Sequence, residues 1–137
     1  MAQMMYGLDT NVLVRFLVLD DEQQTAAAQA AMEKAAAAAQ PLVVSLLSIL
    51  ETEWVLRSRY RFCKETVVRT FKALLETRDL LIDDEGVLEQ ALYLYENSSA
   101  DFADCLMISR YGRIGCAAML TFDTRAAQVP GGQLLTT

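Results

Sequence analysis

Acidic residues at the ends of apolar runs are the groups of this 137-residue sequence that could do chemistry. Asp9 follows the apolar run 4–8, and Glu51 follows the run 42–50. Asp101 and Asp104 are three residues apart, and Asp123 follows the run 117–122. Placing charged carboxylates beside buried strands costs free energy unless a positively charged group binds them. A bound divalent cation is the simplest such group, which makes these five acids candidate metal ligands.

The rest of the composition restricts both the metal and the reaction. The sequence has no histidine, which excludes Ser-His and Cys-His nucleophile pairs and the zinc sites that depend on imidazole. Cys63, Cys105 and Cys116 form no CxxC pair, and we expect three buried, reduced thiols. A site of carboxylate oxygens alone suits Mg²⁺ or Mn²⁺. Such ions can activate water and stabilise a leaving oxygen, so the pattern predicts metal-dependent phosphodiester hydrolysis.

The elements that must position these acids alternate between strands and helices. Apolar runs predict strands at 4–8, 42–45 and 115–121, and shorter candidates at 80–82 and 134–135. Helical spacing predicts helices over 25–39, 48–59, 64–77, 84–96 and 101–111, the last ended by Gly112. This alternation predicts an α/β fold, a single domain over 1–137 with a parallel sheet between helical layers. The acids then follow strand ends or lie in the first turn of a helix, where ligands collect in such folds.

A purely structural interpretation exists for each acid taken alone. Asp9, Asp101 and Asp123 could each cap a helix, and Glu51 could be a solvated surface residue. The placement of all the acids beside strand or helix ends favours a shared site instead.

Charge and hydropathy restrict the partners and the location that we expect for this protein. The net charge of −6 counts against nucleic-acid binding, unless several acids are neutralised by a metal. Basic residues gather over 57–72, where Arg57 and Arg61 are candidates for contact with RNA or a partner; the alternative is a solvated face of two helices. No apolar run approaches the ~20 residues of a membrane span, and the N-terminus lacks the pattern of a signal peptide. We therefore expect a cytoplasmic protein that does not cross a membrane.

Four segments together resemble the PIN-domain ribonucleases, specifically the VapC-type toxins of type II toxin–antitoxin pairs. These segments are residues 8–13, 50–56, 101–106 and 120–123. The resemblance covers nearly the whole chain. It implies a three-layer α/β/α sandwich around a parallel sheet of about five strands. It also implies an acidic Mg²⁺ cleft that cuts RNA through a metal-activated water, a homodimer and a cognate antitoxin protein.

The resemblance also assigns roles to individual residues. The principal acidic positions correspond to Asp9, Glu51, Asp104 and Asp123, with Asp101 as an auxiliary metal ligand. The supporting polar positions correspond to Thr10, Asn11 and Thr121, with Asn11 organising the turn. Glu53 competes with Glu51 for its role, but it lies about 200° further around a helix.

Three alternatives come from other classes of protein. A haloacid-dehalogenase-type phosphotransferase would use Asp9 as a covalent nucleophile, but Asn11 replaces its second Asp and no lysine lies near the later acidic motifs. A response-regulator receiver would use Asp83 or Asp84, but no lysine follows the last strand candidate. A non-catalytic PIN-like interaction domain would be favoured if the chain bound no divalent cation.

Overall fold

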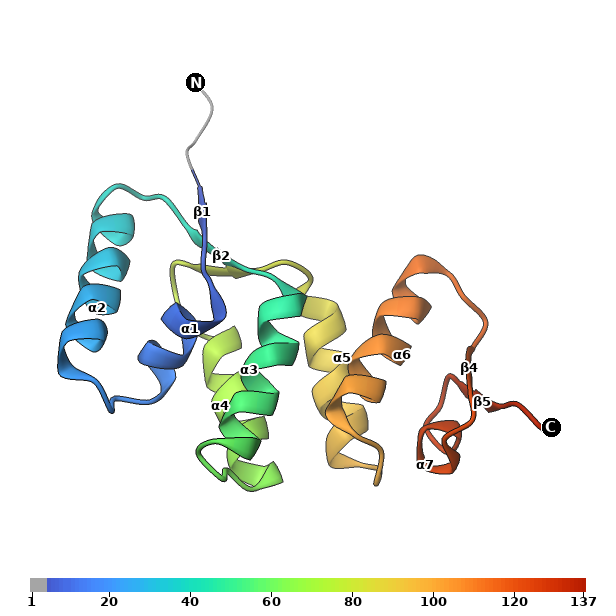
Figure 1. Ribbon diagram of the computed structural model, residues 1–137. Helices are drawn as coiled ribbons and strands as arrows, with labels where there is room; N and C mark the ends of the chain where they lie inside the picture. The colour runs from blue at the N-terminus through green and yellow to red at the C-terminus, as the bar shows by residue number, and fades with distance from the viewer. Residues whose placement is uncertain (1–4) are drawn as a thin grey trace. The chain divides into compact units, whose positions relative to one another are not determined.

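The computed structural model describes residues 5–137, which form two compact units (Figure 1). The first unit is Met1–Asp83 and the second is Asp84–Thr137. Across residues 5–137, seven helices and five strands follow one another, and every strand pair is parallel. The α/β class and the parallel pairing predicted from the sequence are therefore confirmed. That both units belong to one domain stays a prediction.

Three short parallel strands form the sheet of the first unit, in the order β1–β2–β3. They are β1 (Tyr6–Gly7), β2 (Leu42–Val44) and β3 (Leu80–Ile82). Leu42 pairs with Leu80, and both side chains are buried. Because parallel strands run in one direction, their carboxyl ends lie at the same edge of the sheet. At this edge the chain continues into Asp9 after β1, Ser45 after β2 and Asp83 after β3.

Four helices accompany this sheet: α1 (Thr10–Leu17), α2 (Glu22–Ala37), α3 (Leu46–Ser58) and α4 (Lys64–Leu75). Their fully buried side chains include Leu13, Val14, Ile49, Leu56, Val67 and Phe71. The Ala-rich α2 buries only Ala28 and Ala35, and it packs against α1. Asp21 caps it, because its Oδ1 accepts a hydrogen bond from the backbone N–H of Gln24 at 2.9 Å. Throughout residues 5–137, every helix is too short or too polar to cross a lipid bilayer.

The second unit contains α5 (Glu85–Glu96), α6 (Phe102–Ile114), β4 (Met119–Thr121), α7 (Thr124–Ala127) and β5 (Gly132–Leu134). Helices α5 and α6 pack together, and the rings of Tyr95 and Phe102 meet edge to face at a centroid distance of 5.5 Å. Strands β4 and β5 are joined through the short α7. A side chain at position 132 would collide with the carbonyl of Ala126, so this close crossover requires Gly132.

The end of α6 differs from the sequence-based expectation. The helix runs through Gly112 and ends at Gly115, which has a φ of 106°. This left-handed conformation favours glycine and terminates helices. The prediction that Gly112 ends the helix was wrong, and the strand expected at 115–121 is confined to Met119–Thr121.

Other boundaries also shift: the helix expected over 25–39 is Glu22–Ala37, the helix expected over 64–77 ends at Leu75, and the strand expected at 134–135 is Gly132–Leu134. The helix expected from Ser48 begins earlier, at Leu46, because Ser45 caps it and its Oγ accepts from the N–H of Ser48 at 3.1 Å. The strand expected over 4–8 comprises Tyr6–Gly7, and Met4 lies outside the described residues.

All three cysteines are free thiols, but only Cys105 is buried. The expectation of three buried thiols was wrong for Cys63 and Cys116, which are exposed. Cys63 is the N-cap residue of α4, and Cys116 directly follows the residue that ends α6. Apolar packing is poor at such helix ends, which explains their exposure.

Candidate metal centre

Three of the five candidate acids lie in the second unit, where two of them affect the third. Asp101 is the N-cap residue of α6, Asp104 lies in the first turn of that helix, and Asp123 follows β4. The pKa of Asp104 is raised, first because partial burial disfavours its charged form and then because the carboxylates of Asp123 and Asp101 repel it. The second unit thus places Asp101 and Asp123 near enough to Asp104 to disfavour its charged form, an effect that a bound cation would oppose.

Asp101 occupies a capping position without acting as a cap. An N-cap aspartate ordinarily accepts a hydrogen bond from a backbone N–H in the first turn. The side chain of Asp101 makes no such bond, although its backbone has the extended conformation of an N-cap residue. Helix capping therefore does not account for this carboxylate, which is exposed and available to a ligand.

Asp123, by contrast, caps α7 with one of its two oxygens. Its Oδ1 accepts hydrogen bonds from the N–H groups of Arg125 at 2.8 Å and Ala126 at 3.0 Å. The Oγ1 of Thr121 accepts from the N–H of Asp123 at 3.0 Å, which holds the backbone of this turn. Both capping bonds go to Oδ1, so capping orients the carboxylate and leaves Oδ2 for a ligand.

Asp9 has the same arrangement in the first unit. It is the N-cap residue of α1, and its Oδ1 accepts from the N–H of Thr10 at 2.8 Å. The preceding residue is anchored to the sheet, since the N–H of Leu8 donates to the carbonyl of Val43 at 2.8 Å. Asp9 is exposed whereas Thr10 is buried, so the turn presents the carboxylate to solvent.

Helix α3 carries two glutamates that differ sharply in environment. Glu53 is 3% exposed, and Nε of Arg57 donates to its Oε2 at 2.9 Å. Glu51 lies on the exposed side of the same helix. The ion pair with Arg57 occupies the buried carboxylate of Glu53, which leaves Glu51 as the accessible acid of α3.

The donor set of these residues suits a hard dication. All candidate groups are carboxylate oxygens, the ligands that Mg²⁺ and Mn²⁺ prefer. Within neither unit, over residues 5–137, do three carboxylates or thiols lie close enough to hold one ion.

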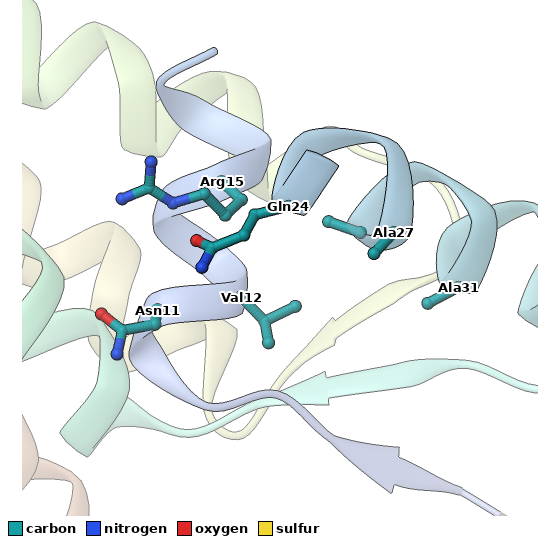
Figure 2. A pocket seen from close by; sticks show the side chains of 7 residues that line it. Asn11, Val12, Arg15, Gln24, Ala27 and Ala31 are labelled. Carbon is teal, nitrogen blue, oxygen red and sulfur yellow. The ribbon is translucent and has the colours of Figure 1, made fainter. Parts of the chain in front are cut away.

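Beside the helix that begins after Asp9, a pocket of about 310 Å³ lies between α1 and α2. Asn11 and Arg15 of α1 line it together with Gln24 of α2, and Figure 2 shows their polar groups on the side opposite the small Ala27 and Ala31. The lining is otherwise apolar. Asn11, which the resemblance assigns to the turn, thus also contributes to a pocket wall.

A polar network at the end of α1 was missed by the sequence reasoning. Arg15 forms an ion pair with Asp20 and donates to the hydroxyl of Tyr60 at 3.1 Å, and this hydroxyl donates to Asp20 at 2.7 Å. The hydrogen bond from Tyr60 is the main cause that lowers the pKa of Asp20, and Arg15 adds to it. Because Tyr60 lies 45 residues after Arg15, no local pattern could reveal this link.

The two arginines expected to contact RNA or a partner have different surroundings. Arg57 is bound to Glu53, although its side chain is half-exposed. Arg61 is exposed in the loop between α3 and α4, where its backbone adopts a φ of 56°. Arg61 is therefore the better candidate for an intermolecular contact.

Comparison with known proteins identifies one matching family. The model of the PIN domain family matches residues 6–132. A toxin–antitoxin complex from Klebsiella pneumoniae is 20% identical over 96% of each chain, with a TM-score of 0.35. The Mycobacterium tuberculosis toxin VapC20, described as cleaving the sarcin-ricin loop, is 16% identical over 90% of this chain and 93% of its own, with a TM-score of 0.36. These two likenesses are too distant to carry an argument about function. No curated protein matches the chain.

Proposed function

The chain belongs to the PIN domain family, and from this premise we propose that it is a metal-dependent endoribonuclease. The observation that carries the proposal is the set of accessible carboxylates described above, in a chain whose residues 6–132 match the PIN domain model. A bound cation would relieve the repulsion that the carboxylates of Asp123 and Asp101 exert on Asp104. Membership of the family leaves the phosphotransferase and receiver alternatives without support.

We assign the metal to the acids that remain accessible in each unit. These are Asp9 and Glu51 of the first unit, and Asp101, Asp104 and Asp123 of the second. Mg²⁺ or Mn²⁺ bound by them would polarise the phosphoryl group of RNA and activate a water for attack. With no histidine in the chain, the carboxylates themselves are the groups that can accept the proton released from that water.

The protein contributes orientation to this reaction. Asp9 and Asp123 each have Oδ1 fixed by backbone N–H groups, so Oδ2 is presented in a set direction. Ligands held in this way need little reorganisation when charge develops during the reaction. Thr121 supports Asp123 through the backbone, and Thr10 donates its own backbone N–H to Asp9.

We further propose that this nuclease is the toxin of a toxin–antitoxin pair and acts in the cytoplasm. The proposal follows from the VapC-type resemblance of the sequence, which also implies a homodimer. An antitoxin would inhibit the enzyme by covering its acidic cleft. A basic side chain of the antitoxin could replace the cation there, because it meets the same group of carboxylates.

The test is cleavage of RNA by the purified full chain, with the ends mapped on total RNA. We expect cleavage in Mg²⁺ or Mn²⁺ and none in EDTA. Asp9→Asn and Asp104→Asn should each abolish cleavage, whereas Glu89→Gln, an exposed acid on α5, should leave it unchanged. Cleavage that persists in EDTA would overturn the metal mechanism. An intact chain that binds no divalent cation and cuts no RNA would instead be a PIN-like interaction domain.

A further inference from the structure

Two serine hydroxyls connect α3 to the backbone that precedes Asp9. Ser45 follows β2, and Ser48 lies in the first turn of α3. The Oγ of Ser48 donates to the carbonyl oxygen of Leu8 at 3.4 Å, and the Oγ of Ser45 donates to the Oγ of Ser48 at 3.5 Å. The hydroxyls therefore form a short chain that ends on the peptide group between Leu8 and Asp9.

This peptide segment is held from both sides. The N–H of Leu8 donates to the carbonyl of Val43 in β2, and its carbonyl accepts from Ser48 in α3. The first contact fixes the end of β1 within the sheet. The second fixes the same residue to the helix that follows β2, at the point where the chain turns into α1.

Ser48 also has a defined relation to Glu51. The two residues are three positions apart on α3, so their side chains project from the same face of the helix. One hydroxyl thus joins the helix that carries Glu51 to the residue directly before Asp9. We propose that Ser48 is a positioning residue that sets the placement of Asp9 relative to Glu51; this rests on the proposed nuclease function.

The link can be removed without removing the cap of α3. That cap is the bond from the backbone N–H of Ser48 to the Oγ of Ser45, which Ser48→Ala leaves in place. The variant loses the hydroxyl that donates to Leu8 and accepts from the hydroxyl of Ser45. Ser48→Thr restores a hydroxyl at the same position. Helix α3 offers a matched control in Ser58, whose hydroxyl donates to the carbonyl of Trp54 at the opposite end.

The kinetic test measures RNA cleavage at saturating Mg²⁺ by wild type, Ser48→Ala, Ser48→Thr and Ser58→Ala. Supporting contacts of this kind ordinarily change activity by about 10- to 100-fold. We expect kcat to fall about 10-fold in Ser48→Ala with little change in KM for RNA, because positioning acts on the reaction rather than on substrate binding. Ser48→Thr should recover most of kcat, and Ser58→Ala should match wild type. An unchanged kcat in Ser48→Ala, or a Thr variant as slow as the Ala variant, would overturn the proposal.

A second readout does not depend on cleavage. The carbonyl ¹³C resonance of Leu8 and the amide resonance of Asp9 should shift in Ser48→Ala and return toward the wild-type positions in Ser48→Thr. If the resonances shift while the wild type cuts no RNA, the proposed function fails and the structural link stands. If they do not shift, the link itself is absent, whatever the activity.

Discussion

The two glutamates of α3 give a sharp prediction, because the structure assigns them opposite roles. Glu53 is buried and bonded to Arg57 at 2.9 Å, whereas Glu51 is exposed. Glu53→Gln should therefore cost folding stability, and Glu51→Gln should cost activity. Each change removes one charge and keeps the shape of the side chain, so the two variants serve as controls for each other.

The size of each effect follows from the local contacts. A hydrogen bond to a charged group contributes about 1.5–3 kcal/mol to stability. Since the side chain of Arg57 is 50% exposed, solvent screens this pair, and we expect Glu53→Gln to cost about 1–2 kcal/mol. Glu51→Gln should stay within about 0.5 kcal/mol of wild type, as surface substitutions usually do. If Glu51 is a metal ligand, a loss of about 3 kcal/mol of transition-state stabilisation would lower kcat by about 100-fold.

Two assays read these effects separately. Urea unfolding in EDTA, followed by circular dichroism, gives the free energy of unfolding without metal. Cleavage of a short RNA in Mg²⁺ gives kcat and KM. The assignment of a structural role to Glu53 and a metal-binding role to Glu51 is refuted if Glu53→Gln abolishes cleavage at wild-type stability while Glu51→Gln remains fully active.

Other predictions concern the remaining acids and the exposed arginine. In EDTA, Asp104→Asn should be more stable than wild type at neutral pH. Because the pKa of Asp104 is raised by folding, the wild type loses stability as pH rises through that pKa, and the advantage of the variant should vanish at acidic pH in urea titrations. Asp123→Ala should lose about 1 kcal/mol of stability with its cap, whereas Asp101→Ala, which removes no capping bond, should lose less than about half of that in the same titrations. Arg61→Ala should weaken RNA binding and reduce its salt dependence without changing the affinity for Mn²⁺. If the variant binds RNA as tightly as wild type in a binding titration, Arg61 has no role in RNA binding.

Local sequence patterns predicted most elements of this fold, but they gave no bounds for α1 and α7, which entered only as helices that Asp9 and Asp123 could cap. Helical spacing located α2 to α6, although α2 begins at Glu22 rather than at residue 25, because Asp21 caps it. Boundaries failed where a single backbone conformation decided them. Gly115 rather than Gly112 ends α6, because only the residue with positive φ stops the helix, and φ cannot be read from the presence of glycine alone.

The candidate site could be predicted from the sequence only in part. The residue types and their positions in the sequence indicated the candidate acids. The role of each acid, however, depends on contacts between residues that are distant in the sequence. The bond from Ser48 to Leu8 spans 40 residues, so the spacing of two serines before Glu51 was its only local signal. Periodicity placed Glu53 opposite Glu51 but could not show that Arg57 neutralises it, since i,i+4 pairs of this type also occur on solvated helices.

Titration of the ¹⁵N-labelled full chain with Mn²⁺ tests whether the proposed acids bind the same ion, because a bound paramagnetic ion broadens the amide signals near it. The account predicts that the signals of Asp9, Glu51, Asp104 and Asp123 broaden together at the same low Mn²⁺ concentration and recover when Mg²⁺ displaces the ion. Broadening confined to the acids of one unit, or spread evenly over all surface carboxylates, would contradict it.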